Sequence, residues 1–124
     1  MAFRPTRRAT VVDDLVPFAS CPRPVRRQLA AHTDVLRPAA GTVLARQGAV
    51  AREVVVIVAG EVDVEHDGCP DAPLGPGGWF GSEEVLLGHP HRCTIIAREG
   101  VDLRVVNGPA FRAAAAHLPT LAHP

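Results

Sequence analysis

Lysine is absent from this sequence, cysteine occurs three times, and aromatic residues make up only 4% of the chain. The 13 residues counted as lysine plus arginine are therefore all arginine, and 13 acidic residues balance them to a formal net charge of zero. A neutral chain has no overall electrostatic attraction to nucleic acid. The short basic run at Arg4, Arg7 and Arg8 is interpreted as a solvated tail rather than a nucleic-acid-binding arm.

The sequence also lacks long apolar runs. Asp13, Asp14 and Pro17 interrupt the segment that follows the basic start, so a signal peptide is not predicted. No stretch approaches the ~20 apolar residues that cross a membrane. The three cysteines show no spacing that suggests a disulfide framework. We therefore expect a cytoplasmic protein without a membrane partner.

What the chain does contain is aliphatic residues. With few aromatics, the core must be built from Val, Leu, Ile and Ala, and clustered Val and Ile favour strands. A length of 124 residues predicts one domain with a core of its own. We expect a disordered tail at 1–10, the domain at 11–119 and a C-terminal tail at 120–124.

Strands dominate the predicted secondary structure. The continuous apolar run at 54–58 predicts a strand buried on both faces, and the alternation at 61–65 predicts a half-buried one. Further strands are expected at 42–44, 94–97 and 103–106. Residues 67–78 are rich in Gly, Pro and Asp and are interpreted as a loop with tight turns.

Short helices are predicted around these strands. Pro24 suits the first turn of a helix over 24–30, and a short helical start is expected near 13–18. A helix over 82–87 is predicted, and Asn107 is expected to cap a terminal helix. The fold class predicted is mainly β, an antiparallel β-roll (jelly-roll-like) with short flanking α-helices.

Three stretches, Leu44 to Gly48, Val55 to Val64 and Leu74 to Gly81, resemble the cyclic-nucleotide-binding domain. This domain occurs in catabolite-activator-type regulators, cyclic-nucleotide-dependent kinases and gated channels. The resemblance runs from about 16 to 119, and its glycines fall where that roll turns its corners: Gly41, Gly48, Gly60, Gly77 and Gly81. It implies a non-enzymatic sensor or regulatory domain that binds cAMP or cGMP and signals through a partner.

The phosphate-binding cassette of that family reads Phe-Gly-Glu, a short apolar helix and then Arg. Here it begins Phe80-Gly81-Ser82, and Arg92 lies ten residues after Ser82. Free N–H groups at the start of the helix suit an anion, and the planar fork of arginine can bind two phosphate oxygens. An alternative alignment places His91 at the arginine position; we prefer Arg92 because it keeps a guanidinium. The predicted ligand-binding residues are Gly81, Ser82, Glu83, Arg92, Cys93 and Thr94.

Two departures from the family pattern favour an alternative function. In the family, a glutamate accepts a hydrogen bond from the ribose hydroxyl, and Ser82 occupies its position here. A hydrogen bond to a neutral serine is weaker than one to a charged carboxylate. Ser82 also suits a helix N-cap. Glu83 and Glu84 in the first helical turn would oppose a phosphate. The further helix of family sensors and a helix-turn-helix are both missing, so we expect no DNA partner. The alternative is a degenerate roll that acts as a protein-interaction or assembly module, with a protein partner or by self-association.

Metal and enzyme chemistry are also considered. Imidazole and thiolate suit zinc, and the candidate ligands are His66, Cys69, His89, His91 and Cys93. We expect no metal, because the loop near Cys69 and the cassette usually lie at different ends of the family roll. Cys93 beside Arg92 could be a low-pKa thiol, although a small filler in a strand is favoured. No catalytic residues, nucleotide-binding loop motif or cofactor are predicted.

Overall fold

The computed structural model describes residues 21–117. The expectations for the tails at 1–10 and 120–124 and for a helical start at 13–18 lie outside this range. The strands of the described chain are β1 (Thr33–Leu36), β2 (Val43–Ala45), β3 (Glu53–Ala59), β4 (Val62–His66), β5 (Cys69–Leu74), β6 (Trp79–Phe80), β7 (Thr94–Ala97) and β8 (Asp102–Asn107). Its helices are α2 (Arg23–Ala31), α3 (Ser82–Leu87) and α4 (Gly108–His117).

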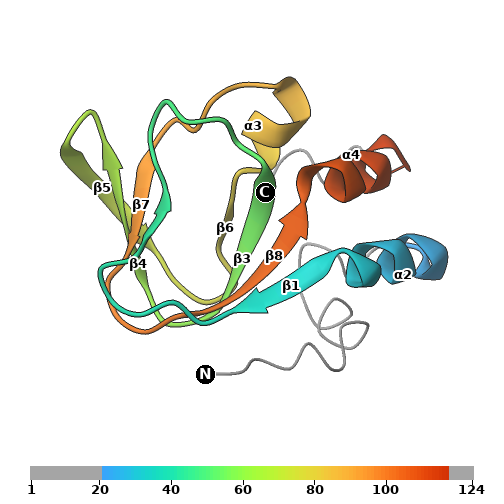
Figure 1. Ribbon diagram of the computed structural model, residues 1–124, viewed down its shortest axis with the longest axis horizontal. Coiled ribbons are helices and arrows are strands. Elements are labelled where there is room, and N and C mark those ends of the chain that lie inside the picture. The colour runs from blue at the N-terminus through green and yellow to red at the C-terminus, as the bar shows by residue number, and fades with distance from the viewer. Residues whose placement is uncertain (1–20, 118–124) are drawn as a thin grey trace.

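The strands form two antiparallel sheets, each of four strands. The first sheet has the order β1-β8-β3-β6 and the second has the order β2-β7-β4-β5. Figure 1 shows α2 and α4 next to each other on one side of the first sheet, far from the β4–β5 hairpin, and α3 above the end of β3. The prediction of a mainly β, antiparallel roll with short flanking helices is confirmed.

Strand β3 lies in the middle of the first sheet and separates two hydrophobic cores. Val54 and Val56 belong to the core beneath the helices, whereas Val55 and Ile57 face the interior of the roll. All four side chains are buried, and the exposed residues of the strand lie at its two ends: Glu53, Val58 and Ala59. This alternation confirms the prediction of a strand buried on both faces, which is why the run carries no polar residue.

Helices α2 and α4 pack on the outer face of the first sheet and contribute Leu29 and Phe111, both fully buried, to the outer core. Pro24 lies in the first turn of α2, as predicted. The Asn107 side chain caps α4, because its Oδ1 accepts a hydrogen bond from the backbone N–H of Ala110 at 2.8 Å. No helix within residues 21–117 has the length and apolarity needed to span a bilayer.

The predicted loop at 67–78 is wrong, because Cys69–Leu74 form β5 and pair with β4. Asp67 and Gly68 make the two-residue turn of this hairpin, with φ angles of 53° and 79°. Pro70 is tolerated because β5 is an edge strand, where a missing N–H costs no internal ladder bond. Strand β1 is a second element that the sequence pattern did not predict.

The glycines expected at the corners of the roll do adopt left-handed backbone conformations. Positive φ angles occur at Gly41, Gly48, Gly60, Gly77 and Gly81. Gly60 shows the steric reason most clearly among the turns, since a Cβ at this position would lie 2.8 Å from the carbonyl oxygen of Gly100. The resemblance in the glycine pattern therefore reflects the backbone path of the roll.

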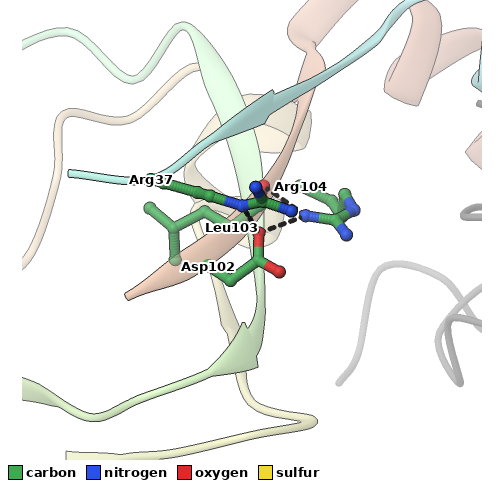
Figure 2. A network of polar contacts seen from close by, with 4 residues as sticks. All are labelled: Arg37, Asp102, Leu103 and Arg104. Carbon is green, nitrogen blue, oxygen red and sulfur yellow. Dashed lines mark hydrogen bonds and ion pairs between the residues drawn. The ribbon is translucent and has the colours of Figure 1, made fainter. Parts of the chain in front are cut away.

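A buried arginine lies on the outer face of the first sheet (Figure 2). Arg104 of β8 is only 8% exposed, and its Nη1 donates to Oδ1 of Asp102 at 2.5 Å and to the carbonyl oxygen of Leu103 at 3.1 Å. Nε of Arg37 lies 3.4 Å from the same Asp102 oxygen. Nε of Arg104 is buried and has no hydrogen-bond partner among residues 21–117. One carboxylate thus compensates two guanidinium groups.

Candidate ligand-binding site

A cavity of about 380 Å³ opens between the second sheet and α3. Its apolar wall consists of Val64, Leu74, Trp79, Phe80 and Ile95. Its polar wall consists of His66, Gly81, Ser82, Glu83, Glu84, His91, Arg92 and Cys93. A cavity lined by both apolar and polar side chains suits a small ligand that has a flat apolar part and an anionic part.

Gly81 joins β6 to α3 at the edge of this cavity. It is the N-cap of α3, with φ of 92°, and no side chain caps this helix end. A Cβ on Gly81 would lie 2.6 Å from the carbonyl oxygen of Glu53, so the backbone here is pressed against β3. The first-turn N–H groups of α3 are consequently not occupied by a capping side chain.

Ser82 lies in the cavity wall but is only 2% exposed. It is the first residue of α3 rather than its cap, so the interpretation of Ser82 as an N-cap is wrong. Because almost none of its surface is accessible, Ser82 offers a ribose hydroxyl very little area for contact. The Ser82 side chain therefore does not replace the family glutamate as an acceptor for the ribose hydroxyl.

Arg92 reaches back across the loop to α3, where its Nη2 donates to Oε2 of Glu83. The Arg92 side chain is 63% exposed and that of Glu83 is 39% exposed. Both residues line the cavity. Arg92, the residue predicted to bind the phosphate, therefore lines the cavity and is already in contact with a carboxylate of the same chain.

Cys93 and Thr94 follow Arg92 at the start of β7 but differ in where they lie. Cys93 lines the cavity, and burial raises the pKa of its thiol, with added contributions from the Asp71 and Glu84 carboxylates that outweigh Arg92. The low-pKa thiol considered from the sequence is thus contradicted. Thr94 does not line the cavity, and its Oγ1 accepts a hydrogen bond from the backbone N–H of Gln47 at 3.1 Å.

The structure brings His66 to the same cavity as His91 and Cys93. The expectation that the two groups of candidate metal ligands lie at different ends is therefore incorrect for His66. Within the described residues, however, no group of three or more His, Cys, Asp or Glu side chains is arranged to hold a metal ion. His89 and Cys69 do not line the cavity.

The site residues predicted from the sequence did not include the apolar wall of the cavity. Val64, Leu74 and Ile95 come from three neighbouring strands of the second sheet, and only the pairing of β4 with β5 and β7 brings them together. The alternation of apolar and polar residues in β4 was a usable signal for inward-facing side chains. It could not indicate which inward positions remain uncovered by the core.

A sequence model of the cyclic nucleotide-binding domain matches residues 36–117. This match spans more than half of the chain and covers the whole cassette. The antiparallel roll agrees with it. The chain belongs to the cyclic nucleotide-binding domain family. No curated protein matches the sequence significantly.

Solved structures show the same fold. A variant of the cAMP-binding acyltransferase from Mycobacterium smegmatis is 32% identical, with a TM-score of 0.73, over 92% of this chain and 37% of that chain. The regulatory domain of Toxoplasma gondii protein kinase A with cAMP is 13% identical, with a TM-score of 0.80, over 96% of this chain and 47% of that chain.

A third similar structure is the regulatory subunit of a cAMP-independent protein kinase A from Trypanosoma brucei. It is 19% identical, with a TM-score of 0.79, over 90% of this chain and 43% of that chain. This chain therefore spans less than half the length of each of the three solved structures. Because the roll occurs in proteins described as cAMP-binding and as cAMP-independent, the fold by itself does not assign a ligand.

Proposed function

We propose that this chain is a regulatory domain that binds a purine 3′,5′-cyclic nucleotide, cAMP or cGMP, in the cavity between α3 and the second sheet. The observation that carries the proposal is the position of Arg92 in the polar wall of a cavity whose other wall is apolar, in a chain that belongs to the cyclic nucleotide-binding domain family. The proposal assigns the phosphate to Arg92 and to the backbone at Gly81. It assigns the base to the apolar wall.

The chemistry of the two ends supports this orientation. A guanidinium binds a phosphate through two parallel hydrogen bonds, and no side chain caps the first-turn N–H groups of α3. Val64, Leu74 and Ile95 provide an apolar surface for a flat ring. Cys93 completes the wall between these two ends as a small, neutral side chain.

The same proposal covers the remaining sequence-based expectations. The domain extends over 11–119, carries out no reaction of its own and works in the cytoplasm. It passes the state of its ligand site to a protein partner or to a second copy, and it does not bind DNA. The similarity to the Mycobacterium smegmatis cAMP-binding acyltransferase supports a regulatory role beside a separate output activity.

Calorimetric titration with cAMP and with cGMP tests the proposal. We expect saturable binding below about 1 mM for one of the two, which corresponds to a binding free energy of about −4 kcal/mol or stronger. Arg92→Ala should weaken it at least tenfold. Arg98→Ala is the matched control, because Arg98 pairs with Glu61 and Asp63 and does not line the cavity. Absence of heat with both nucleotides up to about 1 mM would reject the proposal.

The contact between Glu83 and Arg92 favours a second candidate function. If this pair is never displaced, the roll is a protein-interaction or assembly module without a nucleotide. This function predicts no binding by the wild type or by Glu83→Gln, together with a stable dimer in analytical ultracentrifugation. A monomer that binds neither nucleotide would argue against the first candidate and against self-association.

A further inference from the structure

We infer that Glu83 is an internal competitor for Arg92, so that a ligand phosphate binds only by displacing the Glu83 carboxylate from the guanidinium. The inference rests on the proposed function and adds to it a residue that sets the affinity of the site. In the cavity without ligand, Arg92 contacts Glu83.

The competition follows from the geometry of the pair. Glu83 and Arg92 both line the cavity, and Nη2 of Arg92 donates to Oε2 of Glu83. Among residues 21–117, Glu83 is the one carboxylate that forms an ion pair with Arg92. Carboxylate and phosphate use the same N–H donors of a guanidinium, and they also repel each other. The two anions therefore cannot share Arg92 without loss.

The exposure of the pair decides the size of the effect. With side chains 63% and 39% exposed, the ion pair is well solvated and therefore weak. Competition of this strength lowers the ligand affinity by a small factor, about threefold to fivefold, and does not close the site. Glu83 thus sets how much cyclic nucleotide is needed, while Arg92 determines whether it binds.

Glu84 provides a matched control within the same helical turn. It carries the same charge, also lines the cavity and forms no ion pair among the described residues. Adjacent residues on a helix point in different directions, so a change at Glu84 alters the local charge without releasing Arg92. The difference between the two glutamates therefore isolates the contact from the general repulsion.

The experiment is calorimetric titration of cAMP and cGMP into the full chain and four variants. We expect Glu83→Gln to lower Kd about threefold to fivefold and Glu84→Gln to lower it less than about twofold. In an Arg92→Ala background, Glu83→Gln should give no gain. Raising the salt concentration should reduce the gain at Glu83, because salt screens the exposed pair.

The outcomes separate the inference from the proposed function. If the wild type binds but Glu83→Gln binds equally or more weakly, the competition is rejected and the proposed function stands. Equal gains at Glu83 and Glu84, or a gain that persists in the Arg92→Ala background, would also reject it in favour of simple repulsion. If neither the wild type nor Glu83→Gln binds either nucleotide, both the proposed function and this inference fail.

Discussion

Gly81 lies so close to Glu53 that a Cβ at position 81 would stand 2.6 Å from the Glu53 carbonyl oxygen. The contact places the start of α3 directly against β3, and Gly81 also lines the cavity. It makes Gly81 irreplaceable for two reasons that act together, a positive φ of 92° and the lack of space. The ligand site and the central strand of the first sheet therefore share one backbone contact.

Gly81→Ala should lower the free energy of unfolding by about 2–4 kcal/mol, because it combines left-handed strain with a clash against backbone. Gly77→Ala is the control, since Gly77 has φ of 87° but nothing within 4 Å of its Cβ position. We expect it to cost about 1 kcal/mol. Urea denaturation of both variants measures the difference. Equal losses would contradict the tight approach at Gly81.

Cys93 should react slowly with thiol reagents. Burial first, then the Asp71 and Glu84 carboxylates, raise the pKa of its thiol, so less thiolate is present at a given pH than for an ordinary cysteine. Its alkylation should be slower than that of the exposed Cys69 and should accelerate only at more alkaline pH. Rates from mass spectrometry with iodoacetamide between about pH 7 and 10 check this sign.

One variant and one protection measurement extend the cysteine experiment. Glu84→Gln removes one of the carboxylates that raise the pKa of Cys93 and should speed its alkylation. Saturating cyclic nucleotide should protect Cys93, which lines the cavity, and leave Cys69 unprotected. If Cys93 is alkylated as fast as Cys69 at neutral pH, the Cys93 thiol is not shielded and its pKa is not raised.

The Asp102–Arg104 pair predicts unequal effects of its two partners. Asp102→Asn leaves a guanidinium that is only 8% exposed with less compensation, and it should destabilise the fold by about 1–3 kcal/mol. Arg104→Met removes the buried charge and the unpartnered Nε, and it should stay within about 1 kcal/mol of the wild type. In the double variant, the cost of Asp102→Asn should largely vanish.

Thermal unfolding at fixed pH, followed by circular dichroism, compares these three variants. The decisive quantity is the coupling between the two positions. If Arg104→Met proves more destabilising than Asp102→Asn, the guanidinium contributes more through packing and its bond to the Leu103 carbonyl than it loses through burial.

Asn107→Ala should destabilise the fold by about 1 kcal/mol, because α4 loses the side-chain acceptor for the Ala110 N–H. Asn107→Asp keeps an acceptor at the same place and should retain most of the stability. Urea denaturation distinguishes the two. A loss of similar size in both variants would show that the cap contributes little.

Local sequence signals were sufficient for most of the roll. The Val54–Val58 run, the alternation around Val62 and the cap at Asn107 all predicted the elements that form. Strand β5 was missed because its two prolines and its Gly-rich surroundings were interpreted as loop signals. The stronger signal was the Asp67-Gly68 pair, which is typical of a two-residue hairpin turn between strands. Strand β1 was missed because its four residues include Asp34, a residue type that is depleted in strands.

The site was predictable in its order along the chain but not in its contacts. Arg92 was placed by its spacing from Ser82, and both residues do line the cavity. Spacing along one chain segment cannot show that Thr94 bonds to Gln47 of another strand, or that Ser82 is almost fully covered. These properties depend on how β2, β7 and α3 pack against one another. The residue pattern of a single element does not indicate that packing.

Strand β6 carries a tryptophan that can report on the cavity by its fluorescence. Trp79, the single tryptophan of the chain, lines the cavity and stands edge-on to Phe111 of α4, with ring centroids 6.1 Å apart. The indole thus touches both the ligand site and the helical layer without any added label. Its ultraviolet emission should shift when a base enters the cavity or when α4 moves. The chain therefore carries its own optical probe of whichever event comes first.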